Sequence, residues 1–160
     1  MEEAKNIIDK LQLLPHPEGG FYRETYRSEM KITTENGPLR NVSTAIFYLL
    51  EGADRSHFHR IKSDELWFFH AGQTLEILVL NDHKLERILL GNKLEAGELP
   101  QACIPANSWF ASHVKDESGF SLVSCTVAPG FDFADFEMAE RAELLKEFPN
   151  FKETVERFTR

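Results

Sequence analysis

The stretch from Gly52 to Gly72 holds the residues whose types and spacing could do chemistry: two histidines, His57 and His59, and the carboxylate Glu65. The histidines are two positions apart, and side chains at that spacing on a strand point to the same face. A turn and a second strand could then bring Glu65 beside them. Two imidazoles and one carboxylate form part of a divalent metal shell, with positions left open for substrate or oxygen. We therefore predict that these three residues form the functional centre, as catalytic residues or as metal ligands.

Short segments rich in β-branched and aromatic residues, separated by turn-forming residues, predict the strands that must position this centre. These segments are 21–27, 41–50, 57–60, 65–70, 75–81, 85–90, 99–104, 108–114 and 120–127, with a turn at Asn36-Gly37-Pro38. Helical spacing predicts helices over 3–14, over 135–147 with Asp135 as N-cap, and over 151–158. Short strands at regular spacing indicate an all-β sandwich or barrel, in a single domain of residues 1–160.

The pattern G-x4-H-x-H-x5-E-x6-G, from Gly52 to Gly72, resembles the first motif of the cupin superfamily. Three blocks resemble one small cupin family, called cupin-5 or domain of unknown function 985: PHPEGGFYRETY at 15–26, HFHRIKSDELW at 57–67 and APGFDF at 128–133. The resemblance implies a double-stranded β-helix, or jelly roll, of the RmlC-like cupin type with flanking N- and C-terminal α-helices, and it implies a homodimer. It implies no particular reaction, because one fold carries many activities.

The second cupin motif, P-x-G-x-x-H, is matched only in part by residues 105–110. Asn107 can replace the glycine, since asparagine tolerates a left-handed turn. Phe110, however, occupies the place of the fourth metal ligand. His113 lies three positions later and, on a regular strand, points to the opposite face from Phe110; a bulge could reorient it. A divalent metal such as Fe, Mn, Ni or Zn would therefore be held by the first-motif residues alone, or be absent.

The first long strand offers two alternative sets of polar residues for the interior. Tyr22, Glu24 and Tyr26 share one face, while Arg23 and Thr25 share the other. The first set could supply a proton donor and an acceptor to a ligand, and the second could hold a carboxylate or phosphate. The sequence does not choose between them.

Aromatic residues complete the predicted substrate pocket. Trp67 shares a strand face with Glu65, so it becomes a pocket wall if Glu65 points inward. We therefore assign the pocket to Tyr22, Glu24, Trp67 and Phe110.

Two further histidines and two cysteines are given simpler roles. His70 falls on the strand face opposite Glu65, and His16, in a proline-rich turn, is expected at the surface. Cys103 and Cys125 are expected to be reduced, because nothing in the sequence indicates secretion.

Composition and missing motifs exclude several classes of function. The net charge of −8 and the pI near 5.3 argue against nucleic acid or an anionic membrane surface as partner. No apolar run approaches the ~18 residues of a membrane span, and the N-terminus lacks the features of a signal peptide, so a cytoplasmic protein is expected. The absence of a phosphate-binding loop and of a G-x-S-x-G elbow excludes nucleotide hydrolysis and serine-esterase chemistry.

Three functions, all with a small-molecule ligand in the barrel, remain open. The first is an enzyme with a bound divalent metal, such as an oxygenase or a metal-assisted isomerase. The second is a metal-free sugar epimerase or isomerase, in which a histidine acts as base and a tyrosine as acid. The third is a binding or storage module without turnover, so whether the protein is an enzyme stays undecided.

Overall fold

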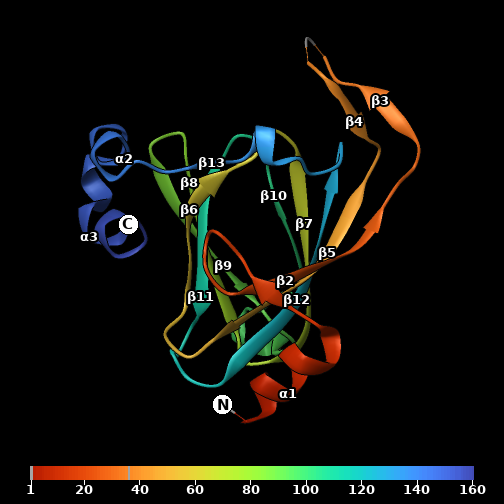
Figure 1. Ribbon diagram of the computed structural model, residues 1–160. Helices are drawn as coiled ribbons and strands as arrows, with labels where there is room; N and C mark the ends of the chain where they lie inside the picture. Colours follow the sequence, from red (N-terminus) through yellow and green to blue (C-terminus); the bar gives the residue numbers. More distant parts are fainter. Residues whose placement is uncertain (1, 36) are drawn as a thin grey trace.

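The chain folds into two antiparallel sheets that face each other as a jelly roll, which confirms the predicted fold class (Figure 1). The structure is a computed structural model that describes residues 2–35 and 37–160. In the first sheet the strand order is β1 (Leu14–Pro15), β2 (Phe21–Arg27), β5 (Thr44–Glu51), β12 (Phe120–Ala128), β7 (Asp64–Gly72) and β10 (Gln101–Ile104). In the second sheet the order is β13 (Glu137–Met138), β6 (Arg55–Arg60), β11 (Trp109–Val114), β8 (Leu75–Asn81) and β9 (Lys84–Leu90).

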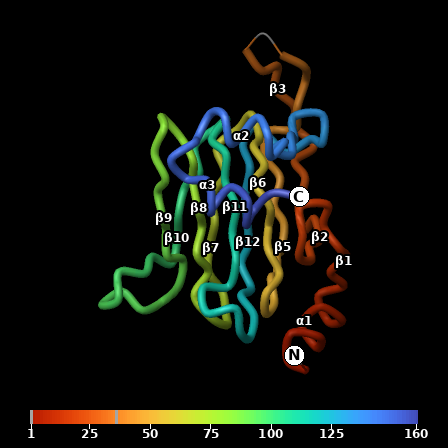
Figure 2. Tube along the Cα trace, turned by 90° about the vertical axis from the view of Figure 1, so that its left-hand side faces the viewer, coloured from red at the N-terminus to blue at the C-terminus, as the bar shows by residue number. Residues whose placement is uncertain are grey.

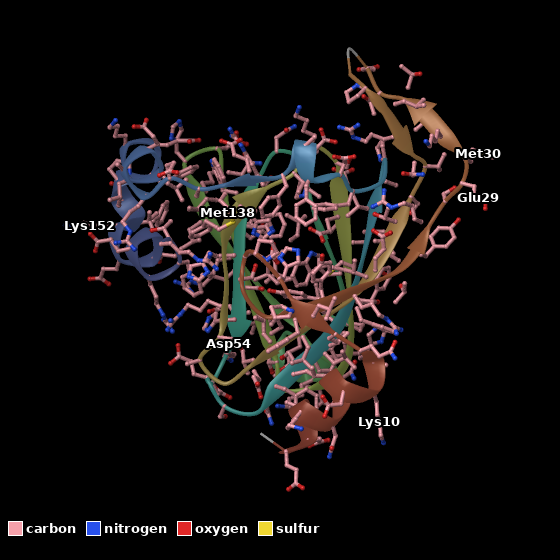
Figure 3. All side chains as sticks on the ribbon, viewed as in Figure 1. Lys10, Glu29, Met30, Asp54, Met138 and Lys152 are labelled. Carbon is pink, nitrogen blue, oxygen red and sulfur yellow. The ribbon has the colours of Figure 1, made fainter. Side chains whose placement is uncertain are left out.

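The space between the sheets is filled by side chains, of which alternate residues along a strand point inward (Figure 3). On β12, for example, Val123 and Cys125 are buried in this inner core, whereas Ser124 between them is only half-buried. Tyr48, Trp67 and other large side chains close the core at its centre. Successive side chains of such a strand therefore point alternately to the inside and to the outside of the barrel. Both cysteines are free, as expected.

Helices cover the outside of both sheets at the two ends of the chain. The helix α1 (Glu2–Leu11) packs Ala4 against Leu49 and Phe120 at one end of the first sheet. The helices α2 (Arg141–Glu147) and α3 (Lys152–Arg157) cover the outer face of the second sheet (Figure 2). Short 3-10 turns occur at Leu94–Ala96, Phe133–Asp135 and Pro149–Phe151. None of the helices in the described ranges is long and apolar enough to cross a membrane.

A two-stranded hairpin of β3 (Lys31–Thr33) and β4 (Leu39–Asn41) projects from the barrel and was not predicted from the sequence (Figure 1). Its strands are three residues long, too short for alternation to be recognised. Figure 3 shows Met30, at the base of the hairpin, pointing away from the barrel. The predicted turn at Asn36-Gly37-Pro38 falls at the tip, where Asn36 lies outside the described residues.

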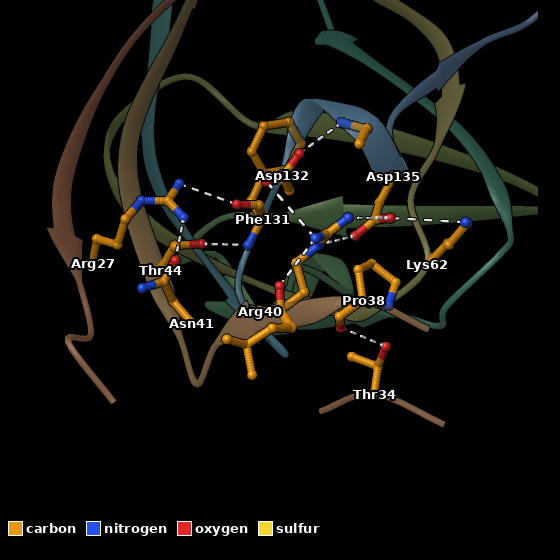
Figure 4. A network of polar contacts seen from close by, with 12 residues as sticks. Arg27, Thr34, Pro38, Arg40, Asn41, Thr44, Lys62, Phe131, Asp132 and Asp135 are labelled. Carbon is orange, nitrogen blue, oxygen red and sulfur yellow. Dashed lines mark hydrogen bonds and ion pairs between the residues drawn. The ribbon is translucent and has the colours of Figure 1, made fainter. Parts of the chain in front are cut away.

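The helix predicted over 135–147 is wrong in its first turn and a half, because α2 begins only at Arg141. Asp135 is not an N-cap: its carboxylate accepts hydrogen bonds of 2.7 and 3.0 Å from Arg40 of β4 (Figure 4). Asp132 instead caps the preceding 3-10 turn through the Ala134 N–H, at 2.8 Å. Residues 131–136, which we call the mouth segment, cross one end of the barrel before α2 starts (Figure 1).

Candidate functional site

A cavity of about 510 Å³ opens between the two sheets beneath the mouth segment. Its polar wall combines residues far apart in the sequence, from the loop before β2 and from β2, β6 and β7. The lining residues that can exchange protons or carry charge are His16, Glu18, Tyr22, Arg23, Glu24, Arg27, His59, Glu65, Cys125 and Asp132. The volume is in the range of small-molecule sites.

The central contact of the cavity is an ion pair between His59 and Glu18. The ring of His59 lies with Nε2 2.9 Å from Glu18 Oε2 and with Nδ1 2.7 Å from the carbonyl oxygen of His57. The carbonyl oxygen of His57 can only accept a hydrogen bond, so Nδ1 carries a proton. Nε2 donates when Glu18 is ionised, and the pair is then an imidazolium beside a carboxylate.

The electrostatics of the pair agree with this proton count. Burial lowers the pKa of His59, but the charge and hydrogen bond of Glu18 outweigh burial and leave that pKa raised. Burial likewise acts to raise the pKa of Glu18, but the charge and hydrogen bond of His59 outweigh it and leave that pKa lowered. Each group thus stabilises the charged form of the other.

The loop that carries Glu18 is held against β6 by a backbone hydrogen bond and against β5 by a side-chain hydrogen bond. The Glu18 carbonyl oxygen accepts from the His57 N–H at 2.9 Å, and the Gly19 carbonyl oxygen accepts from the Tyr48 hydroxyl at 2.6 Å. Gly19 has a φ of 116°, and a Cβ there would collide with the Arg55 carbonyl oxygen. Only glycine allows this close approach, so the G-G pair in the sequence fixes where Glu18 points.

Glu65 faces the same cavity without a strong partner. Glu65 is 8% exposed and has no ion-pair partner within residues 2–35 and 37–160. Burial, followed by the negative charge of Glu18, raises its pKa from 4.5 to about 7, although His59 opposes this shift. The Trp67 and Cys125 side chains are its hydrogen-bonding neighbours, and both also act to lower its pKa. Near neutral pH Glu65 therefore exists in comparable amounts of acid and carboxylate.

The structure brings His59 and Glu65 to the cavity but turns His57 aside. His57 Nδ1 lies 2.8 Å from the Glu18 carbonyl oxygen, and His57 is not part of the cavity wall. The reason is a bulge: His59 pairs with Phe110, whereas the next pair is Ser56 with Ser112, so β6 has one extra residue there. The strict alternation that would place both histidines on one face is interrupted.

The predicted divalent metal does not fit the residues present. Both nitrogens of His59 already carry protons in hydrogen bonds, and His57 points to a backbone oxygen. Phe110 packs its ring 4.1 Å from that of His59, centroid to centroid, at the place of the absent fourth ligand. Across the described part of the chain, no three His, Cys, Asp or Glu side chains converge on a possible metal position.

Of the four predicted pocket residues, two line the cavity. Tyr22 pairs with Tyr48 and Glu24 pairs with Ile46, so the face of β2 that carries Tyr22 and Glu24 is the inward one. Trp67 and Phe110 instead belong to the packed core below, with ring centroids 6.2 Å apart and planes at 90°.

Sequence reasoning missed several residues of the cavity wall, among them His16 and Glu18, and it misplaced His16. His16 was expected at the surface, but its side chain is only 7% exposed and lines the cavity. Its Nδ1 accepts the Glu18 N–H at 3.2 Å, and burial lowers its pKa, so His16 is neutral with its proton on Nε2. Neither His16 nor Glu18 lies on a segment with strand or helix periodicity. The P-H-P-E-G-G block that contains them was the sequence feature that could have pointed to their role.

His70 and His113 lie outside the cavity. His70 is exposed and its Nε2 is 2.8 Å from Ser124 Oγ. His113 is on the outer face of β11, with its Nε2 2.8 Å from Glu76 Oε2 and its ring against Phe158. The face opposite Phe110 was the predicted place for His113.

The sequence and structure of this chain are similar to those of several known proteins. The model of a family described as Cupin superfamily (DUF985) matches residues 5–139. A hypothetical protein from Leishmania major is 38% identical, with a TM-score of 0.93 and 98% of both chains covered. Protein SO0799 from Shewanella oneidensis is 43% identical, with a TM-score of 0.89, covering 98% of this chain and 97% of that one. The uncharacterized protein YML079W of Saccharomyces cerevisiae is 30% identical, covering 89% of this chain and 78% of that protein.

Proposed function

Because the chain belongs to the DUF985 family of the cupin superfamily, and because the names of its relatives state no reaction, we propose a function from the cavity itself. The protein binds a small molecule in the barrel and moves a proton on it without a metal. The observation that carries this proposal is Glu65, a buried carboxyl with a pKa of about 7 that faces a cavity of about 510 Å³. A group with a pKa near the working pH is suited to both taking and giving a proton.

The reaction class that we propose is isomerisation or epimerisation next to a carbonyl. The Glu65 carboxylate takes the proton of the carbon beside the carbonyl, and the electron pair of the broken C–H bond passes to the carbonyl oxygen. In epimerisation the electron pair returns to the same carbon, which takes a proton from the Tyr22 hydroxyl on the wall; Glu65 then releases its proton to solvent and the tyrosinate regains one. In isomerisation of a hydroxy ketone or aldehyde, the hydroxyl proton moves to the former carbonyl oxygen, and Glu65 returns its proton to the former carbonyl carbon. His59 is a weaker candidate for the base, because both its nitrogens are already protonated.

The Glu18–His59 pair has a separate role in this proposal. The carboxylate of Glu18 raises the pKa of Glu65, and the imidazolium of His59 lowers it, although burial is the largest influence. The pair therefore tunes the proton affinity of Glu65 rather than taking the proton itself.

The test is hydrogen exchange in D2O. A panel of small ketones and aldehydes with exchangeable α-hydrogens, carrying hydroxyl or amine substituents, is incubated with the protein and followed by proton NMR. We expect catalysed loss of an α-proton signal for at least one member, and a rate lower by about 100-fold or more in Glu65→Gln. Glu86→Gln, an exposed carboxylate on β9, is the matched control. Exchange at an equal rate in Glu65→Gln, or no exchange with any compound, would contradict the proposal.

We also propose that two copies associate through the outer face of the first sheet. Leu66 and Phe68 of β7 lie there, in register with Thr126 and Ser124 of β12, and both are only half-buried. The described helices pack elsewhere, with α1 at one end of this sheet and α2 and α3 on the other sheet. A twofold-related copy is the commonest way to cover such a face.

A further inference from the structure

The charges on the cavity wall are mostly neutralised in pairs. Glu18 lies 2.9 Å from His59, and Glu24 lies 2.7 Å from Arg27. The Arg27 guanidinium also donates to Asn41 and to the Phe131 carbonyl oxygen, at 2.9 and 3.0 Å (Figure 4). Arg23 also lines the cavity, and its guanidinium lies 3.4 Å from the side-chain oxygen of Gln12, a neutral group. Arg27 is thus already engaged by a carboxylate, and Arg23 is the cavity cation without an acidic partner among the described residues.

Among the acidic residues of the cavity wall, Glu65 differs because no described cation pairs with it. Its carboxyl has no ion-pair partner within the described residues, although it is more than nine-tenths buried and faces the cavity. A buried carboxylate without a partner is costly. A positively charged ligand group beside Glu65 would remove that cost, whereas a second negative charge would add to the repulsion already exerted by Glu18.

The mouth segment supplies an aromatic wall that a ligand beside Glu65 could contact. Phe131, Phe133 and Phe136 pack edge to face, with centroids 4.9 to 6.2 Å apart. All three line the cavity, and Phe133 leaves 52% of its surface exposed. Aromatic faces are negative and attract cations, and they also bind apolar groups. The wall above Glu65 therefore suits a ligand that is both cationic and partly apolar.

We propose that the cavity takes a small organic amine, with its protonated nitrogen at Glu65 and its carbon skeleton against the Phe131–Phe133–Phe136 wall. The inference rests on the proposed function in that it names the substrate class of the same site. A cavity of about 510 Å³ accommodates one ring and a short chain.

Three probes of matched shape test the assignment: 2-phenylethylamine, 2-phenylethanol and 3-phenylpropanoate. Their affinities are measured by calorimetry at pH 7.5. We expect the amine to bind at least about tenfold more tightly than the alcohol, and the carboxylate to bind most weakly. In Glu65→Gln the preference for the amine should disappear. In Phe133→Ala the amine and the alcohol should both bind less tightly.

Two control variants separate specific from general effects. Glu86→Gln removes an exposed carboxylate on β9, and Tyr26→Ala removes a large exposed ring outside the cavity; both should bind the amine as the unmodified protein does. Equal affinity for amine and alcohol, an undiminished preference in Glu65→Gln, or no binding of any probe would overturn the assignment. Binding of the alcohol alone would overturn it while leaving proton transfer intact. Amine binding without deuterium exchange would count against the proposed reaction only.

Discussion

Replacing Glu65 with glutamine should stabilise the protein, and the gain should depend on pH. Glutamine has nearly the same shape as glutamate but cannot ionise. The pKa of Glu65 in the folded protein is about 7, compared with an ordinary value of 4.5. Each unit of pKa difference corresponds to about 1.4 kcal/mol. The buried negative charge therefore costs the folded state about 3 kcal/mol once Glu65 is fully ionised.

The sign follows from where the two states release their protons. Below pH 4.5 Glu65 is protonated in both states and adds no pH dependence. Between pH 4.5 and about 7 the unfolded chain releases the proton while the folded protein retains it. Rising pH therefore favours the unfolded state over this window, and the loss is complete above it. Glu65→Gln avoids the loss, so its advantage grows across the same window.

Urea denaturation at pH 5 and pH 8 measures this directly. The difference in free energy of unfolding between Glu65→Gln and the unmodified protein should rise by about 2 to 3 kcal/mol between the two conditions. Groups that the substitution leaves unaffected cancel in this comparison. Glu86→Gln, at an exposed site, should give no such change. An equal difference at both pH values would refute the argument that Glu65 carries a raised pKa.

Three other outcomes are expected. Glu18→Gln leaves the His59 charge buried without its partner, so urea denaturation at pH 7 should show a loss of about 3 to 5 kcal/mol; a loss below 1 kcal/mol would contradict the ion pair. Equilibrium dialysis with Mn, Fe, Ni and Zn should reveal no stoichiometric site that His59→Ala removes, because His59 has no free nitrogen lone pair. The double substitution Leu66→Glu and Phe68→Glu should convert a dimer to a monomer of 18.4 kDa in sedimentation, and an unchanged mass would exclude this face as the interface.

The barrel itself could be predicted because its strands are short runs of strand-favouring residues separated by turn residues. Segments 21–27 and 75–81 match β2 and β8 at both ends. The mouth segment could not be predicted in this way. The carboxylate of Asp135 precedes a helical pattern, as an N-cap does, but it binds Arg40, 95 positions earlier in the chain. A tertiary ion pair of this kind leaves no local signal.

In the candidate site, too, some residues could be predicted from the sequence and others could not. His59 and Glu65 could be found from strand spacing, and both face the cavity. The orientation of His57 depends on an extra residue in β6, which becomes visible only when β6 is paired with β11. The role of Glu18 depends on a loop that crosses to β6 and is fixed by Gly19. Bulges and loop crossings are set by partners distant in the sequence, so a single strand pattern does not reveal them.

The central claim is that the cavity holds an imidazolium–carboxylate pair beside a carboxyl that titrates near neutral pH. An NMR pH titration of protein labelled with ¹⁵N in histidine and ¹³C in glutamate carboxyls tests it most directly. We predict that both ring nitrogens of His59 remain protonated at pH 7, and that the Glu65 carboxyl titrates with a pKa of about 7. A His59 ring with one unprotonated nitrogen at pH 7, together with a Glu65 carboxyl that titrates near its ordinary value of 4.5, would contradict the claim.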